Sequence, residues 1–390
     1  MAILARTKLI STKKMLEKEF KKKFLYIINT DKFLLSHRIE IAKELLKNNY
    51  EVHLGSAQTE ASYEIKKLGI KAHALNINRS KTDILDLILT GISIYRLIKK
   101  VKPEFVHFIS IKPVLIGCIV SKFFRNKPKL IVSISGLGFI FVDQGLLAKL
   151  RRFFIIILYK ISLSNRELSI IFQNQADKLF ISKICNLSQD QSFLIKGSGV
   201  NLKKFKPSDF KLDNKIVLLP TRIVKSKGIL EFIKAATILR GKSRFVICGD
   251  FDSEAKDKIS QEYINQYVKK NIIEYWGFKE NMSDIYQSST IVVLPSYREG
   301  LPKALCEAGA CGKPIITTKV PGCMDAIINN KTGILVPPRN SRSLAKAIEK
   351  LLNDKNLCQS MGIKGRLNAE KNFNIKKVVE SHLIIYEEIK

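Results

Sequence analysis

Short apolar runs rich in Val, Ile and Leu alternate with amphipathic segments along most of the chain. Runs of this kind are typical of buried parallel strands, and the amphipathic segments between them predict helices. In the first half, strands are predicted over 23–29, 50–55, 71–75, 105–109, 129–134 and 168–172. In the second half they are predicted over 215–220, 244–248, 272–276, 290–294, 314–318 and 333–336. The alternation predicts an α/β protein made of doubly wound, Rossmann-like domains.

The length of the chain indicates two domains, because 390 residues exceed the size at which one hydrophobic core stops growing. A turn-rich basic stretch at 197–207 comes just before the first strand of the second half. We therefore expect an N-terminal domain over 23–202 and a second domain from residue 203. Residues 1–22 form a basic extension, which is either a membrane-facing arm or an over-long start, with Met1 or Met15 as the initiator.

Two glutamates mark the most informative segment of the chain. Glu299 follows the predicted strand 290–294, and Glu307 lies on a helix that is expected to begin at Pro302 and to stop at Gly312. Ligands bind at the carboxyl ends of strands in open α/β sheets. Free backbone N–H groups there can hold a phosphate, and carboxylates can accept hydrogen bonds from sugar hydroxyls. The alternative is two solvated acids beside an ordinary turn.

The segment resembles the donor-binding motif of the retaining glycosyltransferases of family 4. Its core is a Glu, seven residues and a second Glu, in the context Pro-Ser-x-x-Glu-Gly-x-Pro. The resemblance implies the GT-B fold, in which two Rossmann-like domains face each other across a cleft. It also implies that residues 203–374 bind the donor and that a helix over 375–390 returns to the first domain. Glu307 would bind the ribose, and Glu299 with Gly300, Leu301 and Pro302 would contact the donor sugar and phosphates.

The loop after the strand 215–220 carries Arg222 and Lys227. Cations and free N–H groups on a strand-to-helix loop can converge on a diphosphate, although either residue alone could be a solvated charge. The resemblance implies that both neutralise the pyrophosphate leaving group, and makes Arg222, Lys227 and Glu299 the catalytic candidates. Gly249 and Asp250, at the next strand end, and Phe278 are expected to cradle the nucleotide.

The first domain is expected to receive the acceptor. Ser36, His37 and Arg38 are predicted to lie around a helix N-terminus at the cleft, where Arg and His can bind a diphosphate. The alternative is a capping Ser beside an incidental His and Arg. His107, within the strand 105–109, either faces the cleft or is a core histidine.

A glycine-opened loop at Ser135 and Gly136 is the remaining acceptor-side candidate. Many members of family 4 have a His where Ser135 aligns, so a histidine-centred mechanism is not expected here. This loop, the segment Leu35-Ser-His-Arg38 and the segment Ile195–Asn201 together resemble the subgroup that extends undecaprenyl-diphosphate-linked sugars.

The net charge of +32 predicts affinity for anionic surfaces, although a biased genome composition could also produce it. Residues 1–200 hold 34 basic and 15 acidic residues (+19), against 33 and 20 (+13) for the rest. The apolar stripe 150–163, with Arg151 and Arg152, suits either a helix in the lipid headgroup layer or a core helix. No apolar run reaches the roughly 18 residues of a membrane span.

The seven cysteines are scattered, with no Cys-x-x-Cys pair, which indicates reduced thiols and argues against a structural metal. We therefore expect a metal-independent, retaining enzyme that uses a UDP-sugar, most simply a UDP-N-acetylhexosamine, without a cofactor. Its acceptor would be a polyprenyl-diphosphate-linked glycan at the cytoplasmic face of a bacterial membrane, bound peripherally. The alternatives are a nucleotide-sugar 2-epimerase, a nucleic-acid binder, for which no motif is present, and an inactive scaffold.

Overall fold

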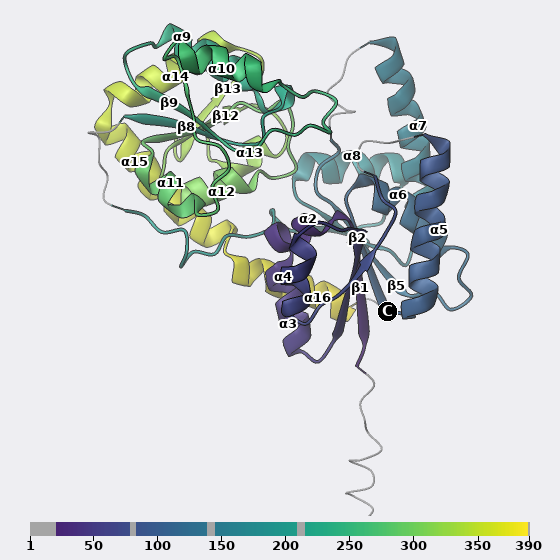
Figure 1. Cartoon of the computed structure of the whole chain (residues 1–390). Helices are drawn as coiled ribbons and strands as arrows, with labels where there is room; N and C mark the ends of the chain where they lie inside the picture. Colours follow the sequence, from purple (N-terminus) through teal and green to yellow (C-terminus); the bar gives the residue numbers. More distant parts are fainter. Residues whose placement is uncertain (1–20, 79–82, 139–144, 209–214, 389–390) are drawn as a thin grey trace, which may run out of the picture.

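The computed structural model describes residues 21–78, 83–138, 145–208 and 215–388. They form two α/β halves, each built around a parallel sheet (Figure 1). The first sheet contains β1 (Lys23–Thr30), β2 (Glu51–Ala57), β3 (Lys71–Ala74), β4 (Phe105–Ile109), β5 (Lys129–Ile134), β6 (Ser169–Phe172) and β7 (Ser192–Leu194). The second contains β8 (Ile216–Pro220), β9 (Arg244–Cys248), β10 (Glu274–Tyr275), β11 (Ile291–Leu294), β12 (Ile315–Thr318) and β13 (Gly333–Val336). The prediction of two doubly wound α/β domains is confirmed.

Both sheets are wound in the same way. Their strand orders are β3-β2-β1-β4-β5-β6-β7 and β10-β9-β8-β11-β12-β13, with parallel neighbours throughout. The direction of winding therefore reverses between β1 and β4, and again between β8 and β11. Loops that leave the carboxyl ends of such strands diverge, and ligands bind in the crevice between them. The fold thus offers one such crevice in each half.

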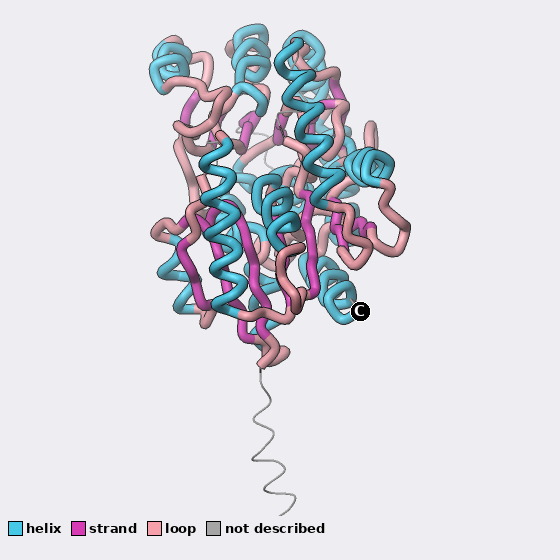
Figure 2. The backbone as a smooth tube through the Cα atoms, turned by 90° about the vertical axis from the view of Figure 1, so that its right-hand side faces the viewer, coloured by secondary structure: helices cyan, strands magenta, loops and turns pink. Residues whose placement is uncertain are grey.

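Helices pack against the strands of both halves (Figure 2). In the first half they are α2 (Asp31–His37), α3 (Ile39–Lys47), α4 (Ala61–Lys67), α5 (Ile84–Val101), α6 (Ile111–Ser121), α7 (Leu146–Ser162) and α8 (Gln175–Cys185). In the second half they are the short 3-10 helix η2 (Lys225–Lys227), α9 (Ile229–Ile238), α10 (Gln261–Lys269), α11 (Met282–Ser288), α12 (Lys303–Ala310), α13 (Cys323–Ala326), α14 (Ser341–Asn353) and α15 (Lys355–Asn372). The chain ends in α16 (Ile375–Glu388).

The helix α14 shows how the sequence specifies these elements. Leu344, Ile348 and Leu351 recur every three or four residues and are buried, so that one face of the helix packs on the hydrophobic core of the second half. Asn340 caps the helix, since its side-chain oxygen accepts a hydrogen bond from the backbone N–H of Ser343 at 2.9 Å. Such a cap stabilises a helix by about 1 kcal/mol.

The central strands are buried on both faces, as expected of parallel sheets between helices, whereas the edge strands β3 and β10 are partly exposed. Every residue of β4 and of β8 is buried. The buried side chains form one hydrophobic core in the second half and two in the first, one on each face of the seven-stranded sheet. Continuous apolar runs were therefore a reliable signal for these strands.

The chain passes between the halves twice, and the two passages are paired. The backbone N–H of Val200 donates to the carbonyl of Phe373 at 2.7 Å, and that of Ile375 donates to the carbonyl of Val200 at 3.1 Å. Beyond this point α16 lies against α3 of the first half (Figure 1). Its residues Val378 and Tyr386 belong to a core of the first half.

Three local features differ from the sequence prediction. The strand β7 was not expected, because three residues at a sheet edge carry too little apolar pattern to recognise. The segment directly after β1 forms the short helix α2, which the sequence analysis did not identify. Pro302 occupies the N-cap of α12, so this helix begins at Lys303, one residue later than expected.

Candidate functional site

The loops after β8 and β11 meet the loop after β5 at the boundary of the two halves. They enclose a cavity of about 270 Å³. Its lining residues are Ser135, Gly136, Gly138, Arg222, Val224, Ser226, Lys227, Ala255, Asp257, Arg298, Glu299 and Gly300. The cavity therefore lies at the switch point of the second sheet and brings together all three catalytic candidates with both candidates of the Ser135 loop.

Each cation of the cavity is held by a carboxylate. Lys227 forms an ion pair with Glu299, and Arg222 forms one with Asp252. The Lys227 side chain is 20% exposed and that of Arg222 is 47% exposed. Their partners Glu299 and Asp252 are only 11% and 9% exposed, so both ion pairs are partly buried. A phosphate group entering the cavity would compete with these carboxylates for the two cations.

The glycine at position 300 allows the two halves to touch. A β-carbon there would overlap the carbonyl oxygen of Ser135 in the first half. The carbonyl of Gly300 accepts a hydrogen bond from Asn174 Nδ2 at 2.8 Å, and the neighbouring Arg298 forms an ion pair with Asp177. The loop that carries Glu299 is thus fixed against the first half by backbone contact and by side chains.

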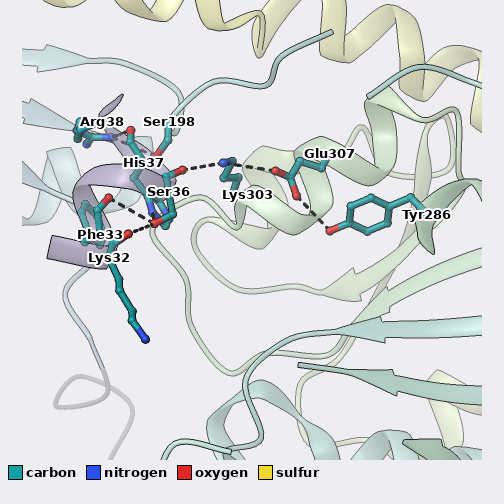
Figure 3. A network of polar contacts seen from close by, with 9 residues as sticks. All are labelled: Lys32, Phe33, Ser36, His37, Arg38, Ser198, Tyr286, Lys303 and Glu307. Atoms are coloured by element: carbon teal, nitrogen blue, oxygen red, sulfur yellow. Dashed lines mark hydrogen bonds and ion pairs between the residues drawn. The ribbon is translucent and has the colours of Figure 1, made fainter. Parts of the chain in front are cut away.

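Glu307 lies one helical turn beyond this loop, on α12, and is 8% exposed. Its carboxylate accepts a hydrogen bond from Tyr286 Oη at 3.3 Å, and Lys303 Nζ lies 3.5 Å away (Figure 3). Burial raises the pKa of Glu307, and the Lys303 ammonium opposes that rise. Lys303 also donates to the carbonyl of Ser36 in the first half at 2.7 Å. A buried carboxylate therefore stands at the boundary with unfilled capacity to accept hydrogen bonds.

The other predicted donor-binding residues lie around this region but do not line the cavity. Gly249 follows β9, and its carbonyl accepts a hydrogen bond from Tyr275 Oη at 2.9 Å. Asp250 is exposed, and Phe278 is 62% exposed. Leu301 and Pro302 are buried behind the loop of Glu299, so only their backbone is available for a contact with a ligand.

The segment Ser36–Arg38 joins two helices. Ser36 and His37 end α2, and Arg38 is the N-cap of α3, so the three residues lie around a helix N-terminus as expected. Arg38 is only 1% exposed; its Nη1 donates to the carbonyl of His37 at 2.9 Å and to Ser198 Oγ at 3.1 Å (Figure 3). Burial, followed by the charges of Lys303 and Arg38, lowers the pKa of His37 to about 3. At neutral pH this imidazole is therefore uncharged.

His107 is a core residue and does not face the cleft. It is completely buried, with Nε2 2.7 Å from Ser133 Oγ and Nδ1 3.0 Å from Tyr386 Oη. Burial lowers its pKa well below the usual range. Of the two readings of His107 that the sequence left open, the core histidine is correct.

Three polar or charged residues of the cavity were missed by the sequence analysis: Arg298, Ser226 and Asp257. Arg298 stands next to Glu299, so its position in the motif could have indicated it. Ser226 and Asp257 gave no such signal. The Asp257 carboxylate accepts a hydrogen bond from the Ser226 backbone N–H at 2.7 Å, which holds the loop of Lys227 in place from a segment thirty residues further along.

Among the described residues, no group of three or more His, Cys, Asp or Glu side chains has an arrangement that could hold a metal ion. None of the helices in these parts of the chain combines the length and the hydropathy that crossing a bilayer requires.

Two doubly wound domains with a charged cavity at their boundary define a glycosyltransferase of the GT-B class. The chain belongs to the family described as Glycosyl transferases group 1, whose model matches residues 200–368. The model described as Glycosyl transferase 4-like matches residues 23–174. The family predicted from the motif around Glu299 and Glu307 is thereby confirmed.

Similar proteins of known sequence include bacterial glycosyltransferases. One is the N,N'-diacetylbacillosaminyl-diphospho-undecaprenol alpha-1,3-N-acetylgalactosaminyltransferase of Campylobacter jejuni, 30% identical over 86% of this chain and 88% of that protein. Another is the capsular polysaccharide biosynthesis glycosyltransferase CapM of Staphylococcus aureus, 28% identical over 94% of this chain and 95% of that protein. A third is the UDP-Gal:alpha-D-GlcNAc-diphosphoundecaprenol alpha-1,3-galactosyltransferase of Escherichia coli, 27% identical over 76% of this chain and 78% of that protein.

Solved structures share the fold at low sequence identity. The sucrose-phosphate synthase of Thermosynechococcus elongatus has a TM-score of 0.79 and 19% identity, covering 95% of this chain and 99% of that chain. The Anabaena protein HepE, solved in complex with UDP and glucose, has a TM-score of 0.75 and 16% identity, covering 94% and 100%. The GT-B fold prediction is confirmed.

Proposed function

We propose that the protein is a retaining glycosyltransferase that moves a sugar from a UDP-sugar to a polyprenyl-diphosphate-linked glycan. The observation that carries the proposal is the cavity in which Arg222, Lys227 and Glu299 face the loop of Ser135 and Gly136. The two cations can bind a leaving diphosphate and the carboxylate can bind the sugar. They face a loop of the first half, which can present an acceptor. The names of the Campylobacter and Escherichia relatives support this acceptor class, and the first of them supports an N-acetylhexosamine as the transferred sugar.

In this proposal Arg222 and Lys227 act on the leaving group. The bond between the sugar C1 and the UDP oxygen breaks, and its electron pair remains on the β-phosphate. Negative charge therefore grows beside the two cations, and an interaction that strengthens in the transition state accelerates the reaction. The two side chains supply the positive charge that a divalent metal ion supplies in other enzymes, so the proposal includes no metal ion or other cofactor.

The acceptor hydroxyl attacks C1 from the face that the diphosphate leaves. Its proton passes to the departing phosphate oxygen as the new C–O bond forms, so the configuration at C1 is retained. No side chain is needed as a base, which agrees with the serine at position 135. Glu307, buried and close to the cavity loop, would accept hydrogen bonds from the ribose hydroxyls.

A screen of nucleotide sugars by thermal shift tests the donor class directly. Ligands that bind only the folded state raise the unfolding temperature by mass action. We expect UDP and UDP-N-acetylhexosamines to raise it more than ADP- or GDP-sugars, and Glu307→Ala to reduce the shift. No response to any uridine nucleotide would contradict the proposal. Release of an epimerised sugar from UDP-N-acetylglucosamine without an acceptor would instead identify a 2-epimerase.

We propose that the enzyme works at the cytoplasmic face of a bacterial membrane, where polyprenyl-diphosphate-linked glycans would be extended. The large positive charge of the chain suits peripheral binding to an anionic leaflet. We include this association in the proposal because helix α7 exposes Leu150, Phe153 and Phe154 beside Arg151.

A further inference from the structure

An apolar groove runs along the first half, with α5 and α7 contributing its walls and α6 lying between them. Its volume of about 1690 Å³ exceeds the roughly 300–1,000 Å³ of a typical small-molecule pocket. Ile88 and Ile92 of α5, Ile116 of α6, and Phe154 and Leu158 of α7 are among its lining residues. The size and the lining suit a long apolar chain better than a compact metabolite.

Apolar side chains remain exposed along both walls of the groove. Ile84 is 77% exposed, Ile88 is 53% exposed and Phe154 is 57% exposed. Contiguous exposed apolar surface of this kind marks a binding site, because removing it from water is favourable. An apolar ligand in the groove would cover these side chains.

The groove is continuous with the reaction cavity. Ser135, Gly136, Gly138 and Asp257 line both. The helix α6 begins at the carboxyl end of β4, and Lys112, in its first turn, also lines the groove. A molecule whose polar head lies at the cavity can therefore extend its tail between α5 and α7.

Basic residues outnumber acidic ones in the lining of the groove. Arg96, Lys99, Lys112 and Arg151 come from α5, α6 and α7 and Lys256 from the second half, against Glu254 and Asp257 of the second half. Lys112 forms an ion pair with Asp86 and donates to the carbonyl of Asn78 at 2.7 Å. The excess of positive charge favours an anionic lipid over a neutral one.

We infer that the groove binds the isoprenoid chain of the acceptor, with its first isoprene units between α5 and α7 and its diphosphate at the cavity end. The inference rests on the proposed function for the identity of the acceptor. It adds that the protein itself, and not only the bilayer, holds the lipid next to the diphosphate. The enzyme would thus recognise its acceptor by chain length as well as by its sugar.

Direct binding of sugar-free prenyl diphosphates tests the groove without requiring any activity. Isothermal titration calorimetry would compare isopentenyl, farnesyl and geranylgeranyl diphosphate, below their micelle concentrations and without vesicles. We expect the affinity to rise with chain length, with geranylgeranyl diphosphate at least about tenfold tighter than isopentenyl diphosphate. An affinity that does not depend on chain length would overturn the inference.

Adjacent phenylalanines provide a matched pair for the same measurement. Phe154 lines the groove and Phe153 does not, although they are 57% and 58% exposed on the same helix. We expect Phe154→Ser to weaken geranylgeranyl diphosphate about tenfold and Phe153→Ser to leave it unchanged. Equal effects of the two substitutions would mean that the groove does not hold the chain. Ile88→Ser and Leu85→Ser repeat the comparison on α5, because Ile88 lines the groove and Leu85 does not.

The two proposals fail in different ways. Chain-length-dependent binding without transfer from any UDP-sugar would reject the proposed function and keep the groove. Transfer to a polyprenyl-linked glycan with identical affinity for short and long prenyl diphosphates would reject the groove and keep the function. Unfolding temperatures of the four variants near that of the wild type would show that they are folded.

Discussion

Arg222 and Lys227 differ from most other basic residues of this chain because their side chains line the cavity at the boundary of the two halves. Both reach the 270 Å³ cavity, and each is oriented by a carboxylate, Asp252 and Glu299 respectively. The exposed Lys225 belongs to the same short helix as Lys227 but does not line the cavity. Arg222 and Lys227 inside the cavity can therefore be compared with Lys225 outside it, on the same loop.

Removing a cavity cation should reduce turnover while leaving the fold intact. We expect Arg222→Ala and Lys227→Ala each to lower kcat by about a hundredfold or more, the effect of losing one group that stabilises transition-state charge. Lys225→Ala should leave kcat within about twofold. UDP release in steady-state assays gives the measurement. Near-normal turnover of a folded Arg222→Ala, Lys227→Ala double variant would remove both residues from the mechanism.

Glu307 should make the protein less stable at neutral pH than it could be. Its raised pKa means that the folded protein keeps a proton that the unfolded chain has already lost, so stability falls as pH rises through that window. We expect Glu307→Gln to unfold at a higher temperature than the wild type at about pH 8. The gain should vanish near about pH 3, well below the ordinary glutamate pKa of about 4.3, where Glu307 is protonated in both the folded and the unfolded protein.

The same substitution should weaken UDP binding, because an amide is a poorer acceptor than a carboxylate for two hydroxyls. Glu280→Gln, at an exposed glutamate, serves as the control for a simple change in net charge. A thermal gain that is equal at both pH values would show that burial of the Glu307 carboxylate does not destabilise the protein. Unchanged UDP affinity would show that Glu307 is not a ligand for the ribose.

Among the elements, the loop between β11 and α12 makes the decisive contact between the halves. Gly300 approaches the Ser135 carbonyl so closely that any β-carbon would force the two loops apart. We expect Gly300→Ala to reduce kcat/KM by about tenfold or more, since a shift of about 1 Å can cost two orders of magnitude. Small-angle scattering should show a more open molecule.

A second glycine provides the control for that prediction. Gly309 lies within α12, where an added β-carbon would meet its nearest neighbour, the Gly365 carbonyl oxygen, at an ordinary distance of 3.5 Å. Alanine is favoured over glycine inside a helix by about 0.5–1 kcal/mol, so Gly309→Ala should raise the unfolding temperature and preserve activity. Equal loss of activity in Gly300→Ala and Gly309→Ala would show that the loss does not come from the contact between Gly300 and the Ser135 loop.

The donor side of the site could be predicted from the sequence because its signals are local. Arg222, Lys227, Glu299 and Glu307 each follow a buried apolar strand within one strand, loop and helix unit, so their place at a strand end can be read from neighbouring residues. The strands themselves were predictable for the same reason. Their continuous apolar runs are required wherever a parallel sheet is covered on both faces.

The acceptor side could not be predicted in this way, because its environment comes from distant segments. His107 is buried by α16, whose Tyr386 is 279 residues further along, and Arg38 is fixed by Ser198. No pattern near His107 or Arg38 encodes these partners. The groove between α5 and α7 likewise exists only once two separate helices pack side by side on α6.

Across the whole molecule, the positive charge and the exposed apolar helices occur together in the first half. Residues 1–200 account for +19 of the net +32. The stripe 150–163 is neither a simple core helix nor fully exposed, since Tyr159 is buried and Leu150, Phe153 and Phe154 are more than half exposed. The first half is therefore the one that we expect to face a membrane.

Binding to vesicles should depend on their charge. Each basic residue near an anionic surface contributes about 1 kcal/mol, and the attraction decays over a Debye length of about 8–10 Å. We expect flotation with anionic liposomes, weakened by salt and by Arg151→Glu with Arg152→Glu. The same charge change on α14, Arg342→Glu with Lys346→Glu, should have a smaller effect. Equal binding to neutral liposomes would assign the net charge to another origin.

The central claim is the retaining transfer of a sugar from a UDP-sugar to a polyprenyl-diphosphate-linked glycan. The most direct measurement is NMR of the anomeric centre of the product, formed by the purified protein from a UDP-N-acetylhexosamine and such an acceptor. We predict UDP release together with an acceptor extended by one sugar, joined in the same α configuration that it has in the donor. A product of β configuration, or consumption of the donor with no extended acceptor, would contradict the account.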